Sequence, residues 1–221
     1  MKYIFSLLII ALTITSCSSQ SDEDRAVIEY AKEAEYNIKG NDVKNTDPAI
    51  LFCYSNYLFE KGEQDEAAFW YYVAQYRYRF MSSCSEKGKA GSYTNEEAKK
   101  IYKDANAYRT DIFDDIILPD KVYRINAYEA IQKVLGAKIN GYAYGDLEQM
   151  KIMIDRMLAY QQENPFNPMG LDPKPVLKSK DIQAEKIEKI KESYGEQKKQ
   201  ITNDADYIKK TRLENGLENR N

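Results

Sequence analysis

The sequence has no histidine in its 221 residues, and this absence limits the chemistry that it can carry. Ser-His and Cys-His nucleophile pairs are excluded, because no imidazole is present to accept the proton of the nucleophile. The common zinc sites that contain histidine are excluded as well. The sequence also lacks a glycine-rich phosphate-binding loop. We therefore expect a protein that is not an enzyme and that binds no metal and no cofactor.

Carboxylate-based hydrolysis is the catalytic mechanism that these absences leave open. It needs two carboxylates that converge in a cleft with different pKa values. The 35 acidic residues bring many carboxylates together by chance, so the sequence indicates no particular pair. The formal net charge of −3 shows no basic excess, and we therefore expect no nucleic-acid partner.

Long hydrophobic runs are scarce, and the clearest one lies at the N-terminus. Lys2 precedes an apolar run from Ile4 to Ile14. This run is too short to span a bilayer, since a transmembrane helix needs about 20 apolar residues. A short apolar run behind a basic residue is typical of a secretory signal peptide. Residues 1–16 are therefore predicted to be removed on export.

The segment Ile14-Thr15-Ser16-Cys17 resembles the lipobox of bacterial lipoproteins, in which small residues precede an acylated cysteine. The resemblance implies that lipid is attached to Cys17 and that its chains anchor the protein in a membrane. Residues 17–24, which are polar after Cys17, would then form a flexible tether. The non-acidic Ser18 favours the outer membrane over the inner membrane, with the protein facing the periplasm of the cell envelope.

Two further cysteines, Cys53 and Cys84, remain in the mature chain. An exported protein meets oxidising conditions, in which a disulfide can form. In a helical hairpin around Gly62, however, Cys84 would lie about 20 Å beyond the residue opposite Cys53, at a rise of about 1.5 Å per residue. A disulfide needs Cα atoms about 4.4–6.8 Å apart. We expect both cysteines to stay unpaired unless the chain doubles back after residue 80.

Apolar residues recur at helical spacing along most of the chain, which predicts an all-α fold of antiparallel helical hairpins with a charged C-terminal helix. Asp47 with Pro48, and a capping box from Thr94 to Glu97, mark two helix starts. The predicted helices are residues 22–38, 48–59, 63–80, 94–113, 122–142, 147–161 and 179–203, with a loop over residues 82–93. They group into a helical domain (25–163), a proline-rich connector (164–178) and a charged C-terminal extension (179–221). The extension is either a solvated helix on the domain or an arm that binds a partner.

The segment from Glu63 to Phe80 carries five consecutive apolar residues, from Phe69 to Val73. Aromatic residues favour strands, but acidic residues crowd the first turn and arginines lie near the end, as the helix dipole prefers. A helix that is apolar on every side is expected at the centre of a bundle.

The hairpin from Leu51 to Ala74 resembles a tetratricopeptide repeat. The matching positions are Leu51, Tyr54, Ser55 and Leu58 in the first helix, Gly62 in the turn, and Ala67, Tyr71 and Ala74 in the second helix. The run from Glu66 to Tyr71 is also similar to the second helix of Sel1-type repeats. Arg79 stands where a proline usually closes the repeat, and one copy cannot form a solenoid, which needs about three. Together with the lipobox and residues 139–146, the hairpin is similar to uncharacterised bacterial envelope lipoproteins.

Two functions are consistent with these features. The first is a non-catalytic interaction module that binds a protein or peptide at the membrane, for which inhibitor and immunity lipoproteins are a specific version. Its groove would be lined by Tyr57, Tyr72, Tyr76 and Arg77, although core packing is the more natural role for these residues. The second is a lipoprotein that binds or modifies peptidoglycan or another saccharide, with Trp70 and neighbouring tyrosines stacked on sugar rings. The second function requires an exposed aromatic platform.

Replacement of Cys17 by alanine tests the predicted anchor. We expect the Cys17→Ala protein to leave the membrane fraction, because no lipid can be attached to it. Fractionation of cells that express either form measures this. A Cys17→Ala protein that stays on the membrane would show that the anchor prediction is wrong.

Overall fold

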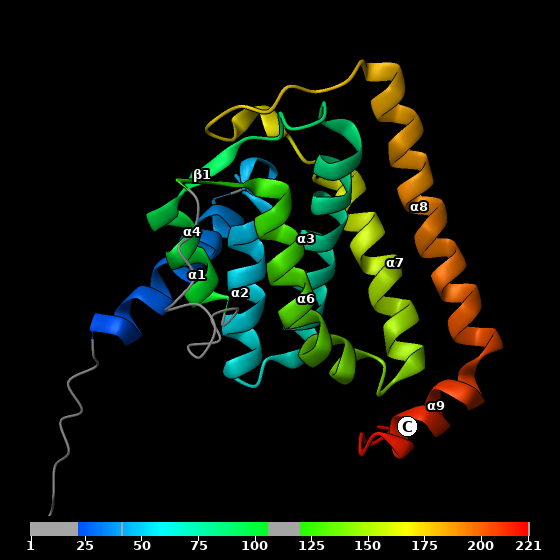
Figure 1. The fold of residues 1–221 in the computed structure, drawn as a ribbon. Helices are drawn as coiled ribbons and strands as arrows, with labels where there is room; N and C mark the ends of the chain where they lie inside the picture. The colour runs from blue at the N-terminus through cyan, green and yellow to red at the C-terminus, as the bar shows by residue number, and fades with distance from the viewer. Residues whose placement is uncertain (1–21, 41, 106–119, 221) are drawn as a thin grey trace, which may run out of the picture.

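The chain folds into α-helices with one small antiparallel sheet (Figure 1), which confirms the predicted all-α class. The structure is a computed structural model, and it describes residues 22–40, 42–105 and 120–220. Its elements are α1 (Asp22–Lys39), the 3-10 turn η1 (Val43–Asn45), α2 (Pro48–Glu60), α3 (Gln64–Cys84), β1 (Ser92–Thr94), α4 (Asn95–Asp104), β2 (Lys121–Tyr123), α6 (Arg124–Ala143), α7 (Leu147–Glu163), η2 (Pro168–Gly170), α8 (Lys180–Asn203) and α9 (Ala205–Glu214). Cys17 and the predicted signal peptide lie outside the described residues.

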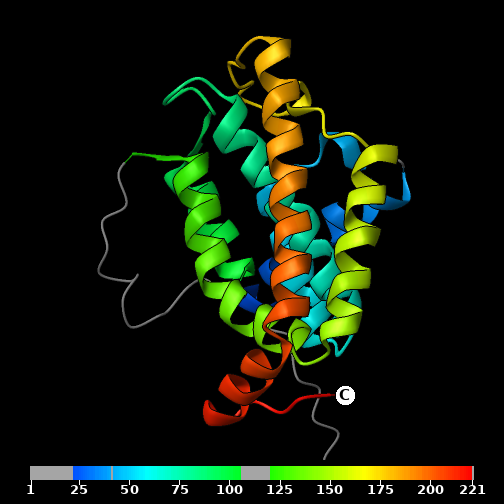
Figure 2. The ribbon, with the colours of Figure 1, turned by 90° about the vertical axis from the view of Figure 1, so that its right-hand side faces the viewer.

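Helix α3 is the central element, as its apolar sequence predicts. It packs against α2, α6, α7 and α8, and in Figure 2 α8 crosses in front of it between α6 and α7. Trp70, Tyr71, Tyr72 and Val73 follow one another along α3, yet all are at most 6% exposed. Such a run of buried residues leaves the middle of α3 no face toward water.

The predicted helix starts are confirmed in detail. The Asp47 side chain accepts a hydrogen bond from the backbone N–H of Ala49, and Pro48 occupies the first helical position of α2. At α4, the Thr94 hydroxyl accepts from the backbone of Glu97, whose carboxylate accepts in return from the backbone of Thr94. The structure describes α4 as far as Asp104, and the remainder of the expected helix lies outside the described residues.

Helices α2 and α3 form the predicted antiparallel hairpin. Small residues lie between them: Ala67 and Ala74 are fully buried, and the Ser55 hydroxyl donates to the carbonyl of Ala67 at 2.6 Å. These contacts allow the close approach expected of a repeat-like hairpin. The likeness to a tetratricopeptide repeat itself stays a prediction.

Two local predictions are wrong. Residues 92 and 93 were expected in a loop and residue 122 at a helix start, but both segments form strands, with Tyr93 paired to Val122. Non-local pairing decides this, because it buries both side chains. In addition, residues 147–161 were expected to pair with 122–142 as a hairpin, whereas α6 and α7 each pack chiefly on α3 and scarcely on each other.

The charged extension is part of the core. Ile190, Tyr194 and Ile201 of α8 are buried in the same apolar cluster as α3. The Tyr194 hydroxyl donates to the Gln75 side chain at 3.0 Å, and the guanidinium of Arg79 lies 4.7 Å from the centre of the Tyr194 ring. Of the two alternatives for this segment, the structure therefore supports a helix packed on the domain.

Cys53 and Cys84 are free and buried. Helix α3 continues to Cys84 and carries this residue past the hairpin, so the chain does not return toward Cys53. Burial raises the pKa of the Cys53 thiol well above its usual value, which keeps it protonated and unreactive.

A buried arginine joins three distant segments. Arg124, the first residue of α6, is 1% exposed. Its guanidinium donates to the backbone carbonyls of Ala90, Asp172 and Pro173, and its Nε lies 3.2 Å from Oδ2 of Asp47. Burial is the largest single effect and lowers the pKa of Arg124, but the charge of Asp47 together with the neighbouring Tyr128 and Tyr93 outweighs it, so the pKa is raised. One side chain thus fixes the loop before β1, the connector and the start of α2.

Gly91 makes room for this guanidinium, and substitution tests the arrangement. A Cβ at Gly91 would collide with Nη1 of Arg124, whereas a Cβ at Gly88 would meet nothing within 4 Å; both residues have positive φ (95° and 73°). We expect Gly88→Ala to lower the free energy of unfolding by about 1 kcal/mol through backbone strain. Gly91→Ala should lower it by about 3 kcal/mol or more, because the buried ion pair is also disturbed.

Urea unfolding followed by circular dichroism measures both losses. Equal losses for Gly88→Ala and Gly91→Ala would mean that Arg124 can move aside at no cost, and that it does not fix these segments.

Candidate binding face

The groove predicted from Tyr57, Tyr72, Tyr76 and Arg77 does not form. Tyr72, Tyr76 and Arg77 are 2%, 6% and 0% exposed, because α6, α7 and α8 cover α3 on the sides that these residues occupy. Tyr57 is partly exposed, but its ring stacks on the Tyr54 ring and carries the ammonium of Lys61 over it, 4.2 Å from the ring centre. Three of the four predicted binding residues are therefore core residues.

Arg77 has a structural role. Its Nη1 donates to the backbone carbonyls of Val43 and Thr46, and its guanidinium lies 5.1 Å from the centre of the Phe166 ring. Burial lowers the pKa of Arg77 to about 10. The side chain thus ties η1 and the connector to α3 and presents no surface to a partner.

Trp70 is also unsuited to the role that the saccharide hypothesis gives it. It is 6% exposed, and its ring packs edge-to-face on Phe69 and Tyr160, with ring centres 5.2 Å and 5.4 Å apart. No exposed platform can form on a ring enclosed in this way. The version of the saccharide hypothesis that stacks sugars on Trp70 is therefore wrong.

The described surface is hollowed around the C-terminal end of α6, on both sides of the C-terminal segment (residues 205–220). Arg212 holds this segment in place, because its guanidinium donates to the carbonyls of Gly141 and Glu218 and to the side chain of Asn219. The backbone N–H of Arg220 donates to the carbonyl of Gly145 at 2.7 Å. A hollow lies on either side of this attachment.

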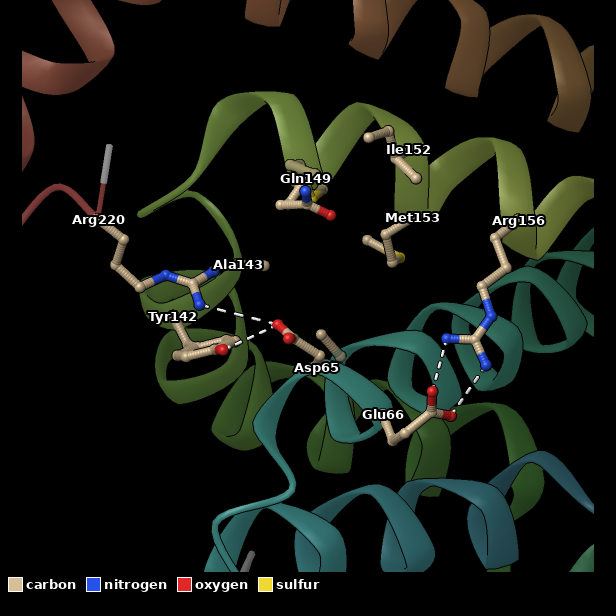
Figure 3. A pocket seen from close by; sticks show the side chains of 11 residues that line it. Asp65, Glu66, Tyr142, Ala143, Gln149, Ile152, Met153, Arg156 and Arg220 are labelled. Carbon is tan, nitrogen blue, oxygen red and sulfur yellow. Dashed lines mark hydrogen bonds and ion pairs between the residues drawn. The ribbon is translucent and has the colours of Figure 1, made fainter.

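The first hollow, which we call the charged pocket, lies between the start of α3, the end of α6 and α7 (Figure 3). It encloses about 310 Å³. Arg156 binds Glu66 through two hydrogen bonds of 2.7 Å and 3.0 Å. Asp65 accepts from the Tyr142 hydroxyl at 2.8 Å and lies 3.7 Å from Arg220. Each carboxylate of the pocket therefore has a cationic partner.

The chemistry available in the charged pocket is limited by exposure. The side chains of Asp65 and Glu66 are 80% and 46% exposed, so neither carboxylate is held in the desolvated setting that general acids use. Exposed ion pairs contribute about 0–1 kcal/mol each. The pocket is best described as a polar rim with an apolar wall formed by Met150, Ile152 and Met153 of α7.

The second hollow, the α6–α9 groove, is larger and encloses about 640 Å³. Its lining comprises Tyr71, Gln132, Lys133, Gly136, Ala137, Asn140, Gly141, Tyr144, Tyr207, Ile208, Thr211, Arg212, Asn215 and Leu217. The floor is low because glycine and alanine lie along α6. The far wall carries the exposed side chains of Tyr207 and Leu217, which are 71% and 43% exposed.

Core residues support this groove from behind. The Tyr72 hydroxyl donates to Oδ1 of Asn140 at 2.7 Å, which orients the Asn140 amide in the lining. The Tyr71 hydroxyl lies beneath Gly136, where a Cβ would come within 2.8 Å of it. One of the four predicted residues, Tyr72, thus acts on the groove indirectly.

The residues of the α6–α9 groove were missed by reasoning from the sequence. The small residues Gly136, Ala137 and Gly141 recur at helical spacing and were a visible signal of one smooth helix face. Nothing local showed that α9 would lie opposite, since contacts between distant residues, such as that of Arg212 with the carbonyl of Gly141, place it there.

Comparisons of the chain with family models, with curated proteins and with solved structures found no match. Within the described part of the chain, no helix is both long and apolar enough to cross a membrane. The same residues contain no cluster of three or more Cys, Asp or Glu side chains placed to hold a metal ion.

The role of Arg212 can be tested by alanine substitution. The guanidinium of Arg212 makes three hydrogen bonds to the C-terminal segment and α6. Arg212→Ala should therefore speed amide hydrogen exchange in Ala205–Glu214 by about tenfold or more. A tenfold change corresponds to a loss of about 1.4 kcal/mol in the free energy of local opening. Exchange in α3 should change little. Lys210→Ala is the control, since Lys210 pairs with Glu214 at 3.8 Å on the surface. Unchanged exchange in the Arg212→Ala protein would mean that other contacts hold α9.

Proposed function

We propose that this protein is a lipid-anchored, non-catalytic binding module of the bacterial cell envelope, which holds a partner protein in the α6–α9 groove. The groove itself is the observation that carries the proposal. Binding sites for other molecules are usually concave, largely apolar and lined by a few polar groups, and the groove has Tyr207, Ile208 and Leu217 beside the Asn140 amide. Inhibitor and immunity lipoproteins are one form that such a module can take.

Two features of the sequence support the remaining parts of the proposal. The lipobox-like segment ending at Cys17 supports the anchor, which would keep the helical body close to envelope proteins. The absence of histidine supports a role in binding, because the usual nucleophile pairs cannot be formed.

A matched pair of substitutions tests the groove. Ala137 is exposed on its floor and Ala184 is exposed on α8, away from the groove. Tagged full-length protein is purified in detergent from its host, and captured proteins are quantified by mass spectrometry. Ala137→Arg should reduce capture of the partner at least tenfold, because a long charged side chain fills the floor. Ala184→Arg should capture as much as the unchanged protein.

If the Ala137→Arg protein captures the partner as well as the unchanged protein does, the proposed use of the groove is contradicted. Retention of the unchanged protein on isolated peptidoglycan, with no captured protein, would instead support the saccharide-binding alternative.

A further inference from the structure

The two walls of the α6–α9 groove both present residues at helical spacing. On α6 the lining residues fall at positions 132–133, 136–137, 140–141 and 144, and on α9 at 207–208, 211–212 and 215. At about 1.5 Å per residue, the α6 wall runs for about 18 Å, or three helical turns. The groove therefore follows α6 from residue 132 to its C-terminal end, and α9 contributes the opposite wall.

The groove suits a third helix better than an extended peptide. Helical walls bond their backbone groups internally, so they offer no strand edge to which an extended peptide could add. A helix brings its own backbone hydrogen bonds and needs only a low floor and an apolar wall. Ala137 and Gly141 supply the low floor, since a Cβ at Gly141 would meet nothing within 4 Å.

The charge of the groove is positive, although the whole chain is acidic. Its lining contains Lys133 and Arg212 and no carboxylate. Lys133 is exposed, and within the described residues it makes no ion pair. Arg212 is 8% exposed and donates to oxygens that carry no formal charge. Burial, together with the nearby charge of Arg220, lowers the pKa of Arg212, as expected for a cation without a carboxylate beside it.

The two cations have a defined separation along the groove. Arg212 lies at the level of Gly141, because its Nη1 is 2.7 Å from the carbonyl oxygen of that residue. Lys133 lies eight residues earlier on α6, which corresponds to about 12 Å. Carboxylates that face both cations would be seven or eight residues apart on one flank of a helix.

We infer that the occupant of the groove is an amphipathic helix of a partner protein, with an apolar face toward Tyr207, Ile208 and Leu217 and two acidic residues seven or eight positions apart. This inference rests on the proposed function and names the chemistry of the partner. Carboxylates near Lys133 and Arg212 speed association and set the register of the helix, while the apolar face contributes most of the affinity.

A displayed peptide library tests this inference on the full-length protein in detergent. One half of the library holds 16-residue peptides on a helix-forming scaffold, and the other half carries a central proline that prevents a helix. We expect selection to enrich helical peptides with the acidic pair at the stated spacing. Replacement of both acidic residues by glutamine should weaken binding at least tenfold, and Ala137→Arg in the protein should weaken it at least as much.

Charge reversal provides a second readout with a matched control. Lys133→Glu should weaken the selected peptides at least tenfold and should restore binding to peptides with lysine at the position that faces it. Lys180→Glu reverses an exposed lysine of α8 that, like Lys133, makes no ion pair within the described residues, and it should have no effect. Binding of the acidic peptides should also weaken as salt is raised.

Several outcomes would overturn the inference. They are enrichment of proline-containing peptides, enrichment without acidic preference, and the absence of any binder sensitive to Ala137→Arg. A dimer of this chain that Ala137→Arg dissociates in native mass spectrometry would assign the groove to a second copy. If Ala137→Arg abolishes capture of the natural partner but no acidic preference appears, the inference fails and the proposed function stands. Normal capture by Ala137→Arg would overturn the proposed function itself.

Discussion

The rest of the fold depends on the need to cover α3 on every side. Consecutive aromatic residues point from this helix in all directions, and each contributes about 1.5–3 kcal/mol when it is removed from water. A single hairpin partner covers one side of a helix, so α6, α7 and α8 must supply the others. This requirement explains why α6 and α7 are separated although a short turn joins them, and why a charged helix near the C-terminus belongs to the core.

Apolar contacts bury α3, whereas polar contacts join the loops at one end of the bundle. Arg124 performs this task by donating to carbonyls of two separate segments while Asp47 supplies the opposite charge. A buried ion pair of this kind adds little net stability over an apolar replacement, but removal of one partner is costly. Asp47 also caps α2, so the start of one helix and the position of the loop before β1 are coupled through one carboxylate.

The proposed binding face lies toward the opposite end of α6, where the C-terminal segment returns to the bundle. Its attachment through Arg212 separates the charged pocket from the α6–α9 groove. The charged pocket is neutralised by its own ion pairs, whereas the groove keeps two cations without carboxylates and an apolar wall open to solvent. This difference is why we propose that a partner protein docks in the groove. The lipid anchor inferred at Cys17 would hold that groove near the membrane.

The amino-acid sequence by itself determined the all-α class, the caps at Asp47 and Thr94, and the central place of α3, because these features follow from periodicity and from hydrogen bonds between neighbouring residues. Only the tertiary structure decided which aromatic residues face solvent. Tyr72, Tyr76 and Arg77 were predicted to line a groove, yet segments from other parts of the chain cover them. Three further features could not be predicted from the sequence: the strand pairing of Tyr93 with Val122, the contacts of Arg124, and the α6–α9 groove. Each joins residues far apart in sequence, and local sequence patterns do not indicate such contacts.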